Sequence, residues 1–238
     1  MAYDQRYDDP QLRDLEEPRP WDLLEIVKQY ARENHLLLDI GCGTAKKLIP
    51  LTQYVRDAYG LEPNPDMRTK AMQNIAASGV KNITLVAGRA EEIPFAENHF
   101  DVITSMLAPH NTYEAYRVLK AGGYCIVERT GEKDKYDLKK EFGIDEHGWR
   151  GQNFSCQPMA NMFFDQFAAL FSEVGVREGF WDSYLTMEGL ILLLEQTPSV
   201  RGFDKEKDSD ILQRIEHLYG TERGIRVQQH RILIVARK

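Results

Sequence analysis

An acidic residue and two glycines accompany the most apolar short stretch near the start of the chain. Residues 36–40 read Leu-Leu-Leu-Asp-Ile, without the alternation of a half-exposed strand, which predicts a strand buried on both faces. Gly41 and Gly43 follow, and they predict a tight turn in which the backbone can approach a ligand closely. A helix is expected over residues 45–54. Strand, glycine turn and helix together form the opening of a nucleotide-binding βαβ unit.

The acidic residues beside this turn narrow the class of ligand. A dinucleotide fingerprint needs a small residue at its sixth position, and Lys46 occupies that position, so a dinucleotide fits poorly. Asp39, just before the turn, favours a ligand with a cationic amino group. Glu62 ends the next apolar run, 23 residues further along, near the spacing at which a carboxylate accepts from ribose hydroxyls. A nucleoside that carries an amino acid instead of phosphates is S-adenosylmethionine (SAM). The sequence therefore predicts a SAM site in which Gly41 and Gly43 give backbone approach.

Five short motifs extend this pattern over roughly residues 35 to 130. They are Asp39-Ile-Gly-Cys-Gly-Thr44, Gly60-Leu-Glu62-Pro-Asn, Gly88-Arg-Ala-Glu-Glu-Ile-Pro-Phe95, His99-Phe-Asp-Val-Ile103 and Arg117-Val-Leu-Lys-Ala-Gly-Gly-Tyr124. Together they resemble the class I SAM-dependent methyltransferases, in the broad group that includes the ubiquinone and menaquinone biosynthesis methyltransferases. The resemblance implies a SAM-dependent methyltransferase with SAM as cofactor, and it leaves the methyl acceptor open.

The fold that this resemblance implies is an α/β, Rossmann-like three-layer sandwich. Its sheet has seven strands, mostly parallel, with an antiparallel last strand, and a helical insertion is added. One domain is expected over residues 1–238, with an N-terminal arm at 1–20 and substrate-side insertions at 129–158 and 186–219. Strands are expected at residues 36–40, 58–62, 83–87, 101–106, 124–128, 174–181 and 225–236. Helices are expected at 21–33, 113–119, 161–171, 187–195 and 209–218, and a further helix is expected to begin at Pro65 and to include Ile75.

The resemblance also implies where the adenine lies. The family's loop reads Gly-Asp-Ala, and its aspartate accepts from the adenine amino group. Arg89 stands at that position and has no acceptor atom, so Ala90 is expected at the ring through its backbone, with Glu91 as the substitute acceptor. Ala45, where the family often has a third glycine, requires a negative φ. The complete set of expected cofactor-binding residues is Asp39, Gly41, Cys42, Gly43, Glu62, Pro63, Met67, Arg89, Ala90, Glu91 and Ser105.

Two of these residues have simpler alternative interpretations. Cys42 is interpreted as a small filler of the glycine turn rather than as a nucleophile. Met67 is expected either beside the adenine or in the core. No cysteine pattern has the spacing of a metal site, and no metal is expected.

The substrate side is expected where the fourth and fifth strands end, because ligands of open α/β sheets bind at that edge. His110 is the candidate general base, since the pKa of histidine lies near neutrality. Asn111 and Glu128 are candidate substrate contacts. The alternative is that Asn111 or Thr112 caps the next helix and that His110 is an exposed loop residue.

Two further segments are expected to face the substrate or cofactor. Residues 129–158 are too long for a passive connection, so they predict a covering segment with Trp149 and Arg150 as contacts. In the N-terminal arm, Tyr3 and Tyr7 are candidates for a lid over the cofactor, and an unstructured terminus is the alternative.

Composition limits the partners. The formal net charge of −7 favours a small-molecule substrate over a nucleic acid. A basic cluster near the C-terminus keeps an RNA methyltransferase as an alternative: Arg223, Arg226, His230, Arg231, Arg237 and Lys238. A SAM- or nucleotide-binding protein without methyl transfer is the third hypothesis. No apolar run approaches the roughly 18 residues of a membrane span. Three cysteines without metal spacing indicate a reducing, cytoplasmic compartment. The sequence leaves open whether the protein is a monomer or a homodimer.

Overall fold

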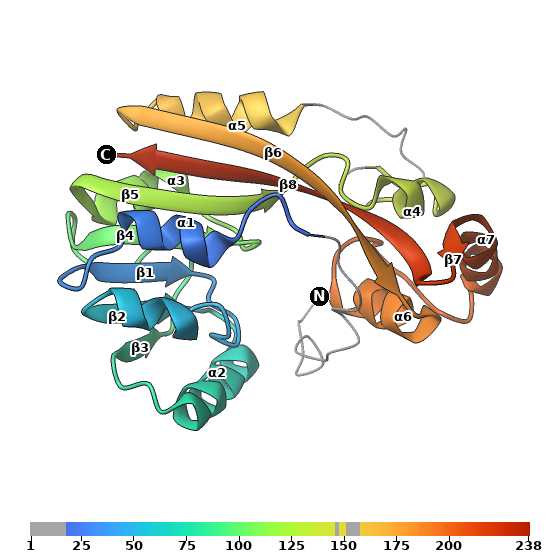
Figure 1. Cartoon of the computed structure of the whole chain (residues 1–238), viewed down its shortest axis with the longest axis horizontal. Coiled ribbons are helices and arrows are strands. Elements are labelled where there is room, and N and C mark those ends of the chain that lie inside the picture. Colours follow the sequence, from blue (N-terminus) through green and yellow to red (C-terminus); the bar gives the residue numbers. More distant parts are fainter. Residues whose placement is uncertain (1–17, 146–147, 151–157) are drawn as a thin grey trace. The chain divides into compact units, whose positions relative to one another are not determined.

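The computed structural model describes residues 18–145, 148–150 and 158–238 (Figure 1). Contacts divide the chain into two compact units. The sheet unit comprises Trp21–Arg129, Ala160–Glu178 and Ile232–Lys238. The accessory unit comprises Met1–Pro20, Thr130–Met159 and Gly179–Arg231. The segments expected as substrate-side insertions, 129–158 and 186–219, therefore belong almost entirely to the accessory unit.

The sheet has the order β3-β2-β1-β4-β5-β8-β6, and the short strand β7 pairs with β8. Its strands are β1 (Leu36–Ile40), β2 (Asp57–Leu61), β3 (Ile83–Val86), β4 (Phe100–Met106), β5 (Leu119–Thr130), β6 (Glu173–Leu185), β7 (Gly220–Thr221) and β8 (Gly224–Arg237). The pairs β1–β2, β1–β4, β2–β3 and β4–β5 are parallel. In Figure 1 the arrow of β8 points opposite to the arrows of its neighbours β5 and β6. The expected mostly parallel α/β sheet with an antiparallel last strand is confirmed.

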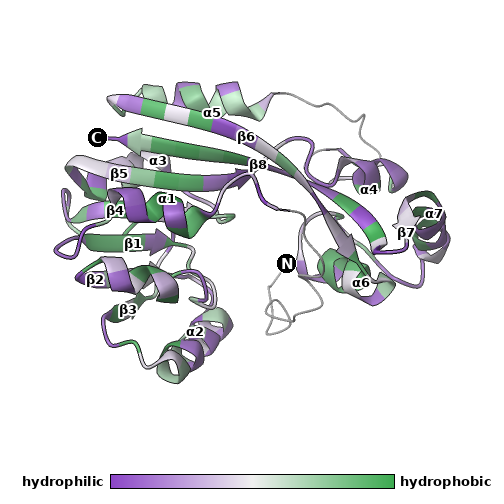
Figure 2. Cartoon of the chain, viewed as in Figure 1, coloured by the Kyte–Doolittle hydropathy of each residue, from purple (hydrophilic) through white to green (hydrophobic). Residues whose placement is uncertain are grey.

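Strand β1 lies at the centre of the core of the sheet unit. All five of its residues are buried, and its green colour in Figure 2 reflects the run of apolar side chains. Leu37 packs in one cluster with Val27 from α1 (Leu23–Tyr30), Leu51 and Leu233. A strand covered on both faces needs apolar side chains on both, which explains why this segment does not alternate.

Helices cover both faces of the sheet. Figure 1 shows α1 on one face and α3 (Thr112–Val118) and α5 (Met159–Ala168) on the other. The helix α2 (Pro65–Ser78) begins as the sequence predicts: Asn64 accepts from the backbone N–H groups of Asp66 and Met67, and Pro65 occupies the first turn. Helix, sheet and helix give the three expected layers.

The expected α-helix over residues 45–54 is wrong. The structure has turns followed by a 3-10 helix, η3 (Ile49–Tyr54). Pro50 lies in its first turn, and Ala45 has a φ of 61°. Proline donates no backbone hydrogen bond and a left-handed residue cannot lie within an α-helix, so the regular i to i−4 ladder does not develop here.

Other differences concern the ends of elements. The strand β5 begins at Leu119, not at residue 124, because Leu119 already pairs with Phe100; a register shift separates this pair from the next one, Val102 and Tyr124. The first helix begins at Leu23, because Asp22 caps it by accepting from the N–H of Leu24. The strand β6 continues to Leu185, four residues beyond its expected end.

The accessory unit has its own apolar core. Its helices are α4 (Tyr136–Glu141), α6 (Met187–Gln196) and α7 (Ser209–Tyr219), so the expected helical pair after β6 is present and α4 is additional. Leu138 of α4 packs in one cluster with Leu190 of α6, Ile215 of α7 and Ile225 of β8. None of the helices in the described part of the chain combines the length and apolarity that a membrane span requires.

Candidate functional site

Asp39 is a buried carboxylate at the end of β1. Its Oδ1 accepts a hydrogen bond from the hydroxyl of Thr104 on the neighbouring strand β4, at 2.8 Å. Burial raises the pKa of Asp39 to about 7, against an ordinary value of 3.8, because the charged form loses its hydration. The positive charge of Lys47 lowers this pKa and the negative charge of Glu62 raises it, but both effects are smaller than that of burial. A cationic ligand would therefore stabilise the ionised form.

Glu62 joins the glycine turn to the end of β2. Its Oε2 accepts from the N–H of Gly43 at 3.0 Å, and its Oε1 accepts from the N–H of Asn64 at 2.9 Å. The side chain is buried, and both bonds fix the orientation of the carboxylate. Each oxygen retains a lone pair, as needed for accepting from a pair of hydroxyls. The structure thus brings Glu62 to the turn that follows Asp39.

The glycine turn requires glycine at Gly41. Its φ is 71°, and a Cβ added there would lie 2.3 Å from the Cβ of Ala108. The N–H groups of Gly41 and Cys42 both donate to the carbonyl of Leu61, at 2.8 and 3.1 Å, which closes the turn against β2. The turn therefore packs between the ends of β2 and β4, at the edge where ligands of open α/β sheets bind.

Three other expected cofactor residues are buried around this turn. Cys42 is buried and burial raises its pKa, so it fills space and does not act as a thiolate nucleophile, as the sequence indicates. The side chain of Met67 is buried, and its Cε lies 3.4 Å from the point where a Cβ would stand if Gly43 had a side chain. Ser105, on β4, donates to the carbonyl of Ala108 at 3.4 Å.

The loop expected at the adenine is more exposed. Arg89 and Glu91 form an ion pair at 3.4 Å, and both side chains face solvent. Glu91 is thus held by the arginine that replaces the family's aspartate. Ala90 between them is buried, and Pro63 is exposed. Their roles toward an adenine stay predictions.

Ala45 departs from the condition set for it. Its φ is 61°, in the left-handed region, and its methyl group is fully buried. The condition of a negative φ is therefore not met. A non-glycine residue in this region is strained by about 1–2 kcal/mol, so the third glycine of the family pattern has a physical reason here.

His110 lies after β4 but is not an exposed loop residue. Both of its ring nitrogens are buried and have no hydrogen-bond partner among the described residues. Its ring centroid lies 5.6 Å from that of Phe167 and 6.5 Å from that of Phe163, both on α5. Burial, with the nearby charge of Arg129, lowers the pKa of His110 to about 4, so the imidazole is neutral near pH 7.

Asn111 has the structural role that the sequence offered as an alternative. Its Oδ1 caps α3 by accepting from the N–H groups of Tyr113 and Glu114. The next residue, Thr112, accepts at its hydroxyl from Gln166 of α5 at 2.8 Å. The loop that carries His110 is thereby fixed against α3 and α5.

Glu128 lies near the end of β5, as expected, but with a partner that sequence reasoning missed. The indole N–H of Trp21 donates to its Oε1 at 2.8 Å, and Glu128 is buried. Arg129, the next residue, was also missed; its Nη1 donates to the carbonyl of Ala108 at 2.6 Å. An arginine directly after a buried strand, at the ligand-binding edge of the sheet, was the available signal.

The remaining predicted contacts lie in the accessory unit. The guanidinium of Arg201 lies 4.3 Å from the ring centroid of Trp149, which is half exposed. Arg150 forms an ion pair with Asp208 at 2.6 Å. Each therefore has a partner within its own unit. The candidate lid residues Tyr3 and Tyr7 lie outside the described residues.

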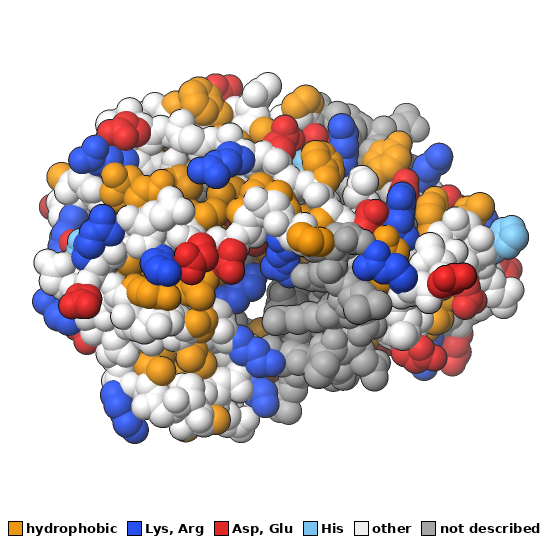
Figure 3. Space-filling model, viewed as in Figure 1, with side chains coloured by type: hydrophobic (Ala, Val, Ile, Leu, Met, Phe, Trp, Pro, Cys, Tyr) orange, Lys and Arg blue, Asp and Glu red, His pale blue; other side chains and the backbone are white. Residues whose placement is uncertain are grey.

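The C-terminal basic cluster does not form one exposed patch. His230 and Arg231 are buried in the accessory unit, and Arg226 faces Asp137 and Asp182 at 3.6 and 3.7 Å. In the sheet unit, Arg237 pairs with Glu173 at 2.9 Å. Both signs of charge are present on the face in view in Figure 3.

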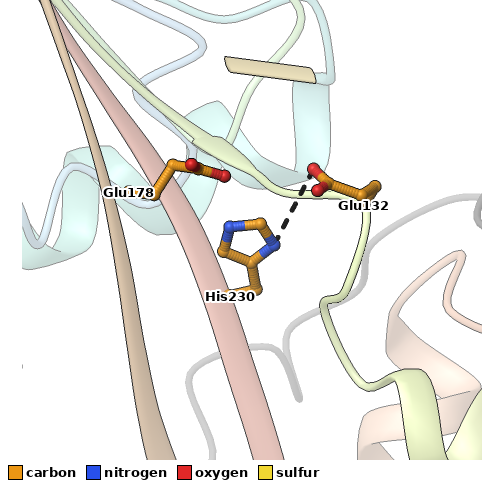
Figure 4. A group of neighbouring side chains, drawn as sticks. All are labelled: Glu132, Glu178 and His230. Atoms are coloured by element: carbon orange, nitrogen blue, oxygen red, sulfur yellow. Dashed lines mark ion pairs between the residues drawn. The ribbon is translucent and has the colours of Figure 1, made fainter. Parts of the chain in front are cut away.

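Buried charges of the accessory unit satisfy one another. Asp134 accepts from Arg231, from the backbone N–H of His230 and from Lys135, the last at 2.7 Å. The ring of His230 accepts at Nδ1 from the N–H of Lys133 at 3.1 Å, and this nitrogen lies 3.9 Å from Glu132 (Figure 4). These contacts join residues 132–135 to the first half of β8.

Comparisons with known proteins agree with this geometry. Residues 38–127 match the family model described as Methyltransferase domain. The demethylmenaquinone methyltransferase of Bacillus mycoides (strain KBAB4) is 32% identical over 167 residues, which cover 59% of this chain and 69% of that protein. The uncharacterized methyltransferase YcgJ of Bacillus subtilis (strain 168) is 31% identical over 119 residues, or 47% of each chain.

Two solved structures have the same fold. The YcgJ protein of Bacillus subtilis matches with a TM-score of 0.64 and 20% identity, over 90% of this chain and 97% of that one. A putative methyltransferase from Bacillus halodurans C-125 matches with a TM-score of 0.64 and 16% identity, over 91% and 98%.

The chain has a Rossmann-like sheet with a glycine turn between two buried carboxylates. This arrangement, together with the similarities above, assigns the chain to the class of proteins with a methyltransferase fold. The chain belongs to the methyltransferase family. In sequence, it spans about half the length of several curated relatives that it matches, such as YcgJ.

Proposed function

We propose that this protein is a SAM-dependent methyltransferase that acts on a small-molecule acceptor. The observation that carries the proposal is the pair of buried carboxylates, Asp39 and Glu62, on either side of the turn formed by Gly41 and Gly43. Asp39 has a pKa that burial raises to about 7 despite the charge of Lys47. Glu62 has its two oxygens oriented by backbone N–H groups.

The residues fit SAM by their chemistry. Asp39 would pair with the ammonium of the methionine part, directly or through water, because a buried carboxylate gains most from a positive partner. Glu62 would accept from the two ribose hydroxyls. Met67 beside Gly43 offers an apolar contact for the adenine, while Arg89 and Glu91 stay candidates for its edge.

SAM supplies a methyl group already activated on a sulfonium. The protein then has to bind the cofactor, align the acceptor and exclude water. The end of β5 serves the acceptor side: Trp21 holds Glu128, and Arg129 holds the loop after β4 through Ala108. His110, neutral near pH 7, is available to accept a proton from an acceptor group.

Binding of SAM and S-adenosylhomocysteine by calorimetry tests this proposal. We expect the unmodified protein to bind both, and Glu62→Gln to bind at least tenfold more weakly, because a charge-assisted contact contributes roughly 1.5–3 kcal/mol. Glutamine keeps the size of the side chain and one oxygen for the N–H of Gly43. The matched control is Glu33→Gln, an exposed glutamate in the turn after α1. Equal binding by the Glu62 variant and the control would remove Glu62 from the site.

The nature of the acceptor and the cellular location complete the proposal. A small molecule is favoured over RNA because the C-terminal basic residues are largely buried or paired with carboxylates. A cytoplasmic location is supported by two buried free thiols among the described residues, Cys42 and Cys125. Methyl transfer to metabolite mixtures, measured with labelled SAM, is the assay for the acceptor, and transfer to total RNA is the contrasting assay.

A further inference from the structure

Arg129 and His110 leave three buried nitrogen atoms without partners in the sheet unit. These atoms are Nε of Arg129 and both ring nitrogens of His110, and none has a hydrogen-bond partner among the described residues. Buried polar groups in native structures are nearly always hydrogen-bonded, because a buried group without a partner loses its hydration and gains nothing in return. Two adjacent side chains with this deficit indicate a ligand that completes them.

The guanidinium of Arg129 has one edge committed and one edge available. Its Nη1 donates to the carbonyl of Ala108 at 2.6 Å, on the loop after β4. The opposite edge, formed by Nε and Nη2, has no partner among the described residues. This edge carries two parallel N–H donors, the geometry that binds a carboxylate through both oxygens. No carboxylate of the described residues pairs with Arg129; the neighbouring Glu128 is bound by Trp21.

The surroundings favour an anion with an apolar body. The charge of Arg129 lies 5.9 Å from the ring centroid of Phe163, and the ring of His110 lies against Phe167 and Phe163. Burial lowers the pKa of Arg129, as expected for a cation that lacks a counter-ion. His110 is neutral near pH 7, so one of its nitrogens carries a hydrogen that an anion can accept, at no cost in positive charge.

We propose that Arg129 and His110 form a carboxylate-binding subsite for the methyl acceptor, with Phe163 and Phe167 contacting its apolar part. The proposal rests on the methyltransferase function proposed above and names the chemical class of its acceptor: a carboxylic acid. Arg129 binds the two oxygens through Nε and Nη2, and His110 donates to one of them. The acceptor is thereby held at the ends of β4, which neighbours the strand of Asp39, and of β5, one strand further on in the sheet order.

Benzoate is the probe for this subsite, with benzamide and phenyl phosphate as comparison ligands. Each is titrated by calorimetry into the full chain saturated with S-adenosylhomocysteine at about pH 7. We expect benzoate to bind at least tenfold more tightly than benzamide, which has the same shape without charge. Tighter binding of phenyl phosphate than of benzoate would overturn the assignment to a carboxylate.

Variants locate the binding. We expect Arg129→Gln to weaken the binding of benzoate at least tenfold. Arg129→Lys should retain only part of the affinity, because lysine lacks the two-donor edge. The matched control is Arg56→Gln, which removes an exposed guanidinium of the same unit that pairs with Asp57. Thermal unfolding of Arg129→Gln checks its fold, and we expect no fall in the midpoint, since a buried unpaired charge is removed.

A second readout follows His110 directly. We expect benzoate to raise the pKa of His110 from about 4, measured by NMR titration of its ring C–H signals, because an adjacent anion favours the imidazolium. If S-adenosylhomocysteine binds while benzoate neither binds nor moves this pKa, the subsite is refuted and the methyltransferase proposal stands. If S-adenosylhomocysteine itself fails to bind, the proposed function fails.

Discussion

Asp39→Asn should make the protein more stable at mildly alkaline pH and, at the same time, bind SAM more weakly. Asparagine keeps the shape of the side chain and an oxygen that accepts from Thr104. It removes a buried charge whose pKa is raised to about 7 from 3.8. This difference corresponds to about 4 kcal/mol of unfavourable free energy when the group is fully ionised in the folded state. Binding of a cationic ligand to the unmodified protein recovers part of that free energy, whereas the variant has no charge at this position with which the ligand could pair.

The raised pKa of Asp39 determines how the stability difference between the two proteins changes with pH. The folded protein holds the Asp39 proton up to about pH 7, whereas the unfolded chain loses it near pH 4, so this group makes the free energy of unfolding fall with rising pH between these values. The variant lacks this decline. The stability of Asp39→Asn relative to the unmodified protein should therefore rise by about 2–3 kcal/mol between about pH 5 and pH 8. Urea unfolding of both proteins at the two pH values measures it, and titrations elsewhere cancel in the difference.

Proton release provides the functional half of the test. Near pH 7, Asp39 is about half protonated without ligand, so SAM binding should release roughly half a proton, detectable by calorimetry in buffers of different ionisation enthalpy. The Asp39→Asn protein should release none and bind SAM at least tenfold more weakly, for loss of a charge-assisted contact. A stability difference that does not change with pH would refute the raised pKa. SAM binding without proton release would refute the pairing of Asp39 with the ammonium.

Two further substitutions test the scaffold. Ala45→Gly should change the free energy of unfolding by less than about 1 kcal/mol, because relief of the left-handed strain offsets the loss of a buried methyl and the greater entropy of unfolded glycine. Ala45→Val should lower the free energy of unfolding by more than about 2 kcal/mol. Equal stability of the two variants would contradict the φ of 61°. Asp134→Asn should lose about 3–5 kcal/mol, since it leaves Arg231 and Lys135 without their buried counter-charge. Urea unfolding measures both, with Glu173→Gln, which breaks an exposed ion pair, as a control of small effect.

Several strands and helices are predicted closely from the sequence, because the pattern of apolar residues within each segment encodes them. Residues 36–40 form β1 with the predicted bounds, and the expected helices α6 and α7 end within one residue of their predicted positions. These elements depend on apolar runs, which local periodicity reveals. The 3-10 helix was missed although Pro50 lies within it, since the pattern of apolar side chains alone suited an α-helix.

The environment of the candidate site could not be predicted in the same way. Asp39 and Thr104 are 65 positions apart, and Trp21 and Glu128 are 107 apart. No local pattern encodes such pairs; only the order of strands in the sheet brings them together. Burial of His110 has the same origin, because it depends on α5, which lies more than 45 positions further along the chain. Sequence reasoning found the residue, and the fold decided its protonation.

Two opposite charges at one sheet edge are the common basis of the proposed cationic cofactor and the proposed anionic acceptor. Asp39 lies near the end of β1 with a pKa that burial raises despite the charge of Lys47. Arg129 lies near the end of β5 without a carboxylate partner among the described residues, and β4 lies between the two strands. If these charges only supported the fold, each should have a partner, as Asp134 and Arg231 do. Each instead lowers the stability of the ligand-free protein. A cationic cofactor and an anionic acceptor would each pair with one of these charges, so each ligand alone should raise the midpoint of thermal unfolding. Asp39→Asn should abolish only the response to the cofactor, and Arg129→Gln should abolish only the response to the acceptor.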